Sequence, residues 1–179
     1  FFHFYGEDDR AHDIIRENHD LLLYEDSGFA IPNQYYDCQH AVEFAKNSPI
    51  DGIGQFGAEQ TSAALSAGGI SVGTPIQTAL FLQLMKSRLG SVYSIPINPD
   101  RTVTLPKFAE EGDVCFLYCS EEALIYSSFI VNGTDEDGKM LGCSRDRINN
   151  EKSAFKVESV CPSSKCSGKI NEILLFHFD

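Results

Sequence analysis

The spacing of apolar side chains divides this chain into a helical first half and a strand-rich second half. Near the start, Asp8 or Asp9 can cap a short helix that runs to about Asn18. Ile14 and Ile15 lie on the inner side of that helix. This pattern predicts a helix that packs one face against a core.

Two more helices are predicted in the first half. Residues 35–46 carry apolar side chains at helical spacing. Thr74 can cap another helix, in which Pro75 takes the first helical position and Gly90 follows the end. Apolar residues lie on more than one face of that helix, which is typical of a buried helix. Residues 47–73 are rich in Gly, Ser and Ala, and we expect them to be mostly loop.

The second half alternates apolar and polar residues in short runs bounded by turn residues. The predicted strands are residues 1–5, 91–97, 114–118, 123–131, 154–160 and 170–178, and residues 101–105 extend or pair with the second of them. Turns are predicted at residues 135–138 and 162–165. Helices followed by strands indicate the α+β class, and the chain shows no repeat or linker, so we expect one domain over residues 1–179.

Six cysteines and one acceptor triplet for N-glycosylation point to secretion. An even number of cysteines allows complete pairing, and the sequence has no C-x2-C pair for a zinc site. Asn132 begins the triplet Asn-Gly-Thr, among turn residues. The cysteines are Cys38, Cys115, Cys119, Cys143, Cys161 and Cys166. We therefore expect a disulfide-stapled, secreted glycoprotein without its signal peptide, and the alternative is a cytosolic protein with buried free thiols.

The positions of the cysteines limit their pairing. Cys115 and Cys119 lie four residues apart in a predicted strand, roughly 13 Å, so we expect them to take different partners. Cys161 and Cys166 either close their own short loop or join the C-terminal strands to Cys143. Five of the six cysteines lie in the strand-rich part. At most one bridge can therefore tie the two halves together.

The chain has a formal net charge of −12, from 26 acidic and 14 basic residues. This charge argues against nucleic acid and anionic membrane surfaces as partners, and no apolar run is long enough for membrane insertion. Residues 60–99 contain no Asp or Glu but keep Lys86 and Arg88. This neutral-to-positive stretch could receive a phosphate-bearing ligand, or it is simply the buried centre of the fold.

Three local patterns resemble binding motifs but lack residues or surroundings that those motifs need. Residues 52–57 match the dinucleotide fingerprint Gly-x-Gly-x-x-Gly, but no apolar strand precedes them and no acid lies about 20 residues further on. Residues 135–138 resemble half of a calcium loop whose first ligand would fall on Gly133, which has no carboxylate. The five histidines show no zinc-ligand spacing with a carboxylate partner. We therefore predict no metal site.

Three short patches of the sequence, taken together with their order along the chain, resemble one known family. Residues 4–15 read FYGEDDRAHDII, residues 69–74 read GISVGT and precede the predicted buried helix, and residues 121–130 read EEALIYSSFI. In this order the patches resemble the ADP-ribosyltransferase toxin family, in the arginine–serine–glutamate class related to the heat-labile enterotoxins. The resemblance covers roughly residues 1–131. It implies two small sheets around a cleft that binds NAD.

The resemblance also implies a role for particular residues. Glu122 would be the catalytic glutamate, which stabilises the oxocarbenium-like state and orients the ribose hydroxyl. Ser71 would brace that carboxylate or the ribose, and an arginine would hold the pyrophosphate. Gly6 stands where the family has its strand arginine, and Arg10 matches a different family arginine, one turn into the following helix. Arg10 could bind the pyrophosphate only if its side chain reached back into the cleft.

These departures from the family pattern favour a fold that is kept after catalysis has been lost. We expect a secreted, toxin-like virulence effector that acts by binding a host or competitor protein, outside the cell or after delivery into a host cell. Such a protein would be a monomer and would need no cofactor. Two alternatives stay open: an active ADP-ribosyltransferase that uses NAD and Glu122, and an unrelated secreted adhesin or inhibitor module.

Overall fold

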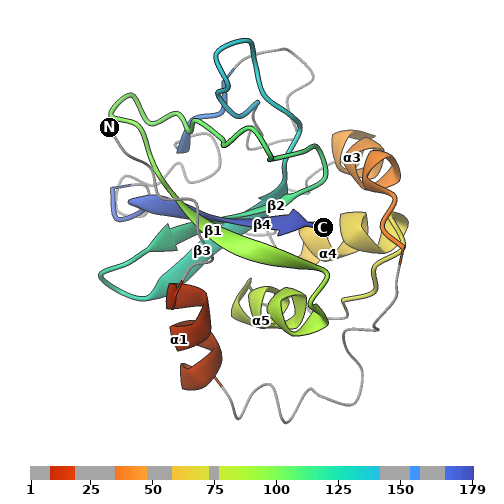
Figure 1. The fold of residues 1–179 in the computed structure, drawn as a ribbon, viewed down its shortest axis with the longest axis horizontal. Coiled ribbons are helices and arrows are strands. Elements are labelled where there is room, and N and C mark those ends of the chain that lie inside the picture. Colours follow the sequence, from red (N-terminus) through yellow and green to blue (C-terminus); the bar gives the residue numbers. More distant parts are fainter. Residues whose placement is uncertain (1–8, 19–34, 48–57, 73–76, 142–153, 158–167) are drawn as a thin grey trace.

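The computed structural model describes residues 9–18, 35–47, 58–72, 77–141, 154–157 and 168–179. Within these ranges it contains four helices and one four-stranded antiparallel sheet (Figure 1). The helices are α1 (Asp9–Glu17), α3 (Cys38–Asn47), α4 (Ala58–Ala67) and α5 (Gln77–Ser87). The strands are β1 (Gly90–Pro96), β2 (Val114–Cys119), β3 (Leu124–Ile130) and β4 (Glu172–Phe178). The α+β class predicted from the sequence is confirmed.

The strand order in the sheet is β1-β4-β2-β3, so the last strand of the chain lies between β1 and β2. All three pairings are antiparallel. Leu174 of β4 lies opposite Ser94 on one side and Phe116 on the other. Every residue of β2 is buried, which requires that both faces of the sheet are covered.

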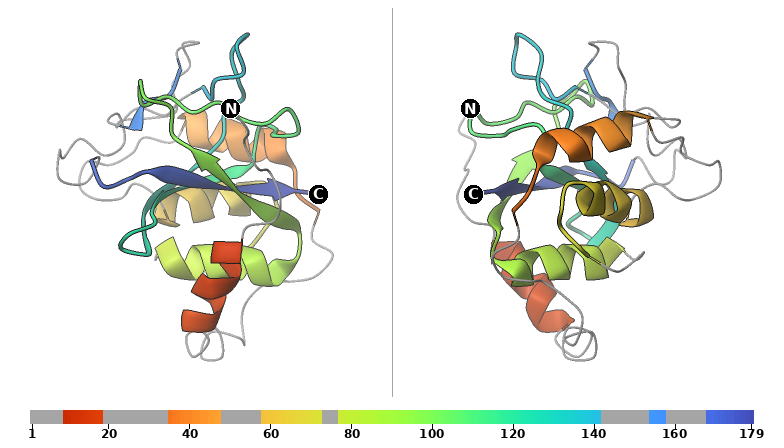
Figure 2. Two further views of the ribbon diagram at one scale, coloured as in Figure 1. Left: turned by 60° about the vertical axis from the view of Figure 1, so that its left-hand side comes forward. Right: turned by 90° about the vertical axis from the view of Figure 1, so that its right-hand side faces the viewer.

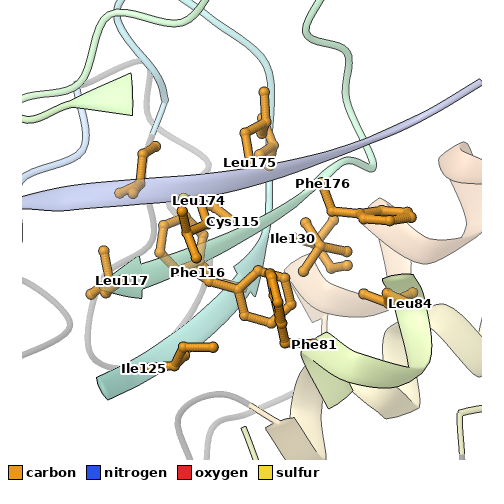
Figure 3. Packing of buried hydrophobic residues seen from close by; sticks show 14 of the residues in the cluster. Phe81, Leu84, Cys115, Phe116, Leu117, Ile125, Ile130, Leu174, Leu175 and Phe176 are labelled. Atoms are coloured by element: carbon orange, nitrogen blue, oxygen red, sulfur yellow. The ribbon is translucent and has the colours of Figure 1, made fainter. Parts of the chain in front are cut away.

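Helices cover one face of the sheet. Phe81 of α5 packs edge-on against Phe116 of β2, with ring centroids 5.2 Å apart. Figure 3 shows Phe81 and Leu84 pointing from α5 toward this face. On the same face, nearer to β3, the α4 residue Thr61 accepts a hydrogen bond from Ser128 of β3 at 3.2 Å. α1 packs on α5, so it lies outside the helices that touch the sheet most closely (Figure 2).

Irregular segments cover the opposite face (Figures 1 and 2). The Met140 N–H donates to the Val103 carbonyl at 2.7 Å, and the Phe155 N–H donates to the Met140 carbonyl at 2.7 Å. All three of these side chains are fully buried. Isolated bridges join these segments, for example between Thr104 and Lys139. The expected pair of small sheets is therefore replaced, in the described part of the chain, by one sheet and a layer of short bridged segments.

The helix α4 lies in the stretch that the sequence predicted to be loop, and that prediction was wrong. Ala58, Thr61, Ala64 and Leu65 are buried at helical spacing, and alanine is the best helix former. The helix ends in a Schellman motif, in which the Ile70 N–H bonds to the Leu65 carbonyl and Gly69 takes a left-handed φ of 101°. Because most of its side chains are small, the sequence shows little contrast between an apolar and a polar face, although the helix forms.

Other boundaries differ less from the prediction. The α5 helix ends at Ser87, and Arg88 rather than Gly90 takes the left-handed conformation after it, with φ 57°. Gly90 instead opens β1, where a Cβ atom would lie 1.9 Å from the His177 carbonyl oxygen. The turn at residues 135–138 is confirmed by a bond from the Gly138 N–H to the Asp135 carbonyl. The predicted first strand, the Thr74 cap and the turn at residues 162–165 lie outside the described residues.

The expectation that all cysteines are bridged is not met among the described residues. Cys38 and Cys119 carry free thiols. Cys38 lies against Gly112, just before β2 begins, whereas Cys119 is the last residue of β2. The length of the strand, roughly 20 Å, separates the two sulfur atoms, and Cys115 lies about 13 Å from Cys119. No disulfide joins any two of these three cysteines, and Cys143, Cys161 and Cys166 lie outside the described residues.

Gly112 is required where α3 approaches the start of β2. Its φ is +93°, and a Cβ atom at this position would lie 2.5 Å from the Cys38 Cβ. We expect Gly112→Ala to lower the free energy of unfolding by about 2–5 kcal/mol, because backbone strain adds to the overlap with α3. Chemical denaturation of the two proteins measures this loss.

Gly133→Ala is the matched control for this substitution. Gly133 has a nearly identical φ of +94°, but its added Cβ atom would meet nothing closer than Glu111 Cγ at 3.6 Å. This variant therefore reports the backbone strain alone, about 1–3 kcal/mol. If the two variants lose the same stability, the close approach of Cys38 to Gly112 is wrong.

Candidate functional site

A pocket of about 360 Å³ lies at one end of the sheet, where α3 begins, β2 begins and β4 ends. We call it the sheet-end pocket. Its walls carry four carboxyl groups and three aromatic rings, together with Cys38 and His177. The acidic and aromatic lining residues are Glu110, Glu111, Asp113, Asp179, Tyr35, Tyr36 and Phe178. Segments far apart in the sequence, at residues 35–38, 110–113 and 177–179, therefore meet at this pocket.

Asp113 and His177 form a buried pair in the wall of the sheet-end pocket. Asp113 Oδ2 lies 2.8 Å from His177 Nδ1 and accepts the Glu110 N–H at 2.9 Å. The other oxygen, Oδ1, accepts the Phe178 N–H at 3.3 Å. The Asp113 side chain is 3% exposed. Burial raises the pKa of this carboxyl group, and the bonds from Glu110 and His177 only partly oppose that effect.

Tyr36 connects the pocket to the start of β2. Its hydroxyl donates to the Gly112 carbonyl at 2.6 Å, and its ring centroid lies 4.3 Å from that of Phe178. Burial, and then the negative charges of Cys38 and Asp113, raise the pKa of this phenol far above its usual value. Tyr36 therefore stays a neutral hydrogen-bond donor. Its neighbour Tyr35 is 82% exposed at the pocket mouth.

This lining is suited to a positively charged group. Carboxylates attract a cation more strongly in a partly desolvated pocket than in water. The faces of aromatic rings attract cations as well, by about 0.5–2 kcal/mol each. An arginine or lysine side chain from another protein has both the charge and the apolar stem that such walls accommodate.

A second polar cluster joins α1 to the sheet. The Arg10 guanidinium donates to both Glu172 and Ser94, and the Ser94 hydroxyl donates to Glu172 Oε2 at 3.0 Å. The Glu172 side chain is 11% exposed and that of Arg10 is 38% exposed. Both Glu172 oxygens are therefore engaged, and an arginine, a serine and a glutamate meet from three separate elements.

Glu122, the predicted catalytic residue, lies in the exposed turn between β2 and β3. Its Oε1 accepts a hydrogen bond from the Tyr126 hydroxyl at 3.0 Å and lies 3.3 Å from Lys169 Nζ. The bond from Tyr126, and then the ammonium group of Lys169, lower the pKa of this carboxyl group. Neither Arg10 nor Ser71 is among the partners of Glu122 in the described part of the chain. The cation beside Glu122 is Lys169.

The remaining predicted site residues lie apart from these clusters. Ser71 is exposed, one residue beyond the Schellman motif that ends α4. Gly6 lies outside the described residues. Asn132, the predicted glycosylation acceptor, is 8% exposed, so a glycan on its amide would require this loop to open. Glu122 and Arg10, to which the resemblance assigns roles in NAD chemistry, are thus held by different sets of neighbours.

The sequence reasoning missed the residues that the structure does bring together. Glu172 is an acid at the head of the apolar run that forms β4, and a lone acid in a buried strand is a signal of a charged partner. Asp113 directly precedes β2 and gave no comparable signal. His177 alternates with the apolar residues of β4 and reads as an ordinary strand position.

Comparison with known proteins gave no match, whether to family models, to curated proteins or to solved structures. Among the described residues, no group of three His, Cys, Asp or Glu side chains could hold a metal ion. None of the described helices is long and apolar enough to cross a membrane.

The raised pKa of Asp113 gives stability a defined pH dependence. The folded state holds this proton more tightly than the unfolded chain, so the contribution of Asp113 is largest below the usual value of 3.8 and is lost as pH rises through the raised pKa. We expect the stability of the wild type relative to Asp113→Asn to fall as pH rises above 3.8 toward neutral pH. Urea denaturation across this range measures it.

Asp100 provides a control of opposite sign. Bonds from the Thr102 hydroxyl and N–H, and from Lys139, lower the pKa of its carboxyl group. Its contribution is therefore present above 3.8 and is lost as pH falls. The stability of the wild type relative to Asp100→Asn should rise as pH rises toward 3.8 and stay constant above it, where the contribution of Asp113 falls. Equal slopes for the two variants would contradict the burial of Asp113.

Proposed function

We propose that this protein is a secreted, toxin-like effector that acts by binding a host or competitor protein through the sheet-end pocket. The observation that carries the proposal is the lining of that pocket, which gathers four carboxyl groups and three aromatic rings around one cavity. The group that this pocket would bind is a basic side chain, arginine or lysine, of the partner protein. Shape and charge both favour that ligand.

Binding without catalysis is also supported by the separation of the residues that the family resemblance implies. Glu122 is engaged by Tyr126 and Lys169, and Arg10 is engaged by Glu172 and Ser94. An arginine that already neutralises a buried carboxylate must release it before it can hold a pyrophosphate. A degenerate ADP-ribosyltransferase-like fold that was retained as a binding scaffold is consistent with these contacts.

The proposal is tested with a peptide that carries one arginine in a Gly/Ser background. We expect this peptide to bind the protein, and its citrulline analogue, which lacks the charge, to bind at least about tenfold more weakly. The double variant Glu110→Gln/Glu111→Gln should lose a similar factor. Titration followed by NMR chemical shifts reports both the affinity and the residues affected, which should include Tyr35 and His177.

A matched charge control distinguishes the pocket from the general acidity of the chain. Glu121→Gln/Glu136→Gln removes the same two charges at exposed positions that do not line the pocket. This control should keep the affinity of the wild type within about twofold. If both double variants weaken binding equally, the peptide is held by net charge alone and the sheet-end pocket is not the site.

NAD-dependent ADP-ribosyl transfer is the second candidate function, and the cluster of Arg10, Ser94 and Glu172 favours it. These are the three residue types that the family chemistry needs, although they come from α1, β1 and β4 rather than from the patches that match the family. In this reaction the bond between nicotinamide and ribose breaks, nicotinamide leaves, and a nucleophile of the target protein takes the ADP-ribose. Glu172 would stabilise the developing cation.

Incubation with labelled NAD and a mixture of proteins tests this second function. If the cluster is catalytic, Glu172→Gln should lower nicotinamide release by at least about 100-fold, whereas Glu122→Ala should leave it within about twofold. Circular dichroism of both variants checks that they fold. The reverse ranking would return the catalytic role to Glu122. Absence of turnover by the wild type would reject this function and leave the binding proposal to be tested separately.

A further inference from the structure

A second cavity, of about 730 Å³, lies between α1, the end of α5 and the start of β1. We call it the helix-side cavity. Arg10, Ser94 and Glu172 do not line it, so it is separate from the cluster that ties α1 to the sheet. His12 comes from α1, Lys86 and Arg88 from the end of α5, and Ser91 from β1. The helices α1 and α5 lie side by side in the fold (Figure 1).

The charge of this cavity is opposite to that of the protein as a whole. Lys86 and Arg88 are both exposed, and the stretch from residue 60 to residue 99 contains no Asp or Glu. Among the described lining residues, Asp179 is the one acidic side chain, beside the two cations Lys86 and Arg88. In a chain of net charge −12, such a balance at a cavity favours an anion locally.

Arg88 is the residue on which this assignment depends. No hydrogen bond or ion pair joins its guanidinium to another described residue. Its backbone has a φ of 57°, in the left-handed region directly after α5, where glycine is the usual residue and another residue costs of order 1 kcal/mol. The chain therefore keeps an unpaired cation at a position where glycine would fold more easily. Arg88 therefore adds a cation to the cavity wall at some cost to stability.

The floor of the cavity limits the kind of anion. Ile15, Leu82 and Met85 supply an apolar surface beside the cations. The volume lies in the range of cavities that hold small organic ligands. Guanidinium and ammonium groups bind phosphate oxygens through charge-assisted hydrogen bonds. We propose that the helix-side cavity binds an organic phosphate monoester, with the phosphate held by Arg88 and Lys86 and the organic group on the apolar floor.

Phenyl phosphate is the probe for this site, because it joins one phosphate to one apolar ring. Titration followed by NMR should give saturable binding, with phenol and inorganic phosphate each at least about tenfold weaker. If inorganic phosphate bound as tightly as phenyl phosphate, the apolar floor would contribute nothing to binding. If phenol bound as tightly as phenyl phosphate, the cations would contribute nothing. Either result overturns the proposal.

Arg88→Gly separates binding from folding. We expect its unfolding free energy to match or exceed that of the wild type, because glycine adopts the left-handed conformation without strain, while its affinity for phenyl phosphate falls at least about tenfold. Arg101→Gly is the matched control, since Arg101 also has a left-handed φ, of 70°, and does not line the cavity. The affinity of this control for phenyl phosphate should stay within about twofold of that of the wild type.

Two results in the variants would overturn the assignment. One is an Arg88→Gly variant that binds phenyl phosphate as the wild type does. The other is an equal loss of affinity in the Arg101→Gly control, which would indicate attraction by charge in general. A phosphate monoester also occurs as a lipid headgroup, so vesicles of phosphatidylcholine with and without phosphatidic acid are included. A soluble ligand predicts that the protein binds neither vesicle, and capture by phosphatidic acid would contradict it.

Discussion

The position of β4 between β1 and β2 is the constraint on which the rest of the structure depends. This strand satisfies the backbone hydrogen bonds of two neighbours at once, and both would otherwise be open edges. Residues Glu172–Phe176 are all buried, since Leu174 and Phe176 face the helices while Ile173 and Leu175 face the layer of bridged segments. The two halves of the hydrophobic core are therefore held together by one strand.

The same strand also places both polar clusters. Glu172, at its start, meets Arg10 and Ser94, and His177, near its end, meets Asp113. The sheet-end pocket and the helix-side cavity both include Asp179, the residue just after the strand. An acidic cavity and a basic cavity thus adjoin at one end of the sheet. If the proposed ligands bind, a cation in the acidic cavity would offset the negative charge that repels an anion from the basic cavity, so each ligand would favour the binding of the other.

The pattern of the sequence predicted the four strands of the sheet, because their apolar residues form short runs between clear turns. The strand predicted at residues 154–160 was wrong, since among its described residues only Ala154 forms an isolated bridge. The pattern also failed at α4, where small side chains hid the helical spacing and the glycine pair that ends the helix read as loop. It could not supply the strand order, because nothing local states that β4 pairs with β1. The clusters were missed for the same reason: Arg10 and Glu172 lie 162 positions apart, and only the completed sheet brings them together. Where the sequence did name candidate residues, Glu122 and Arg10 were found with other partners.

The β2–β3 hairpin has a consequence for how the protein is made. Of the three pairings in the described sheet, it alone joins strands that follow one another closely in the chain. It can form as soon as residue 130 has been synthesised, whereas β1 and the outer edge of β2 wait for β4. Until β4 is in place, β1 and β2 lack their shared neighbour, and the unpaired edge of an apolar half-sheet is a surface that promotes aggregation during folding.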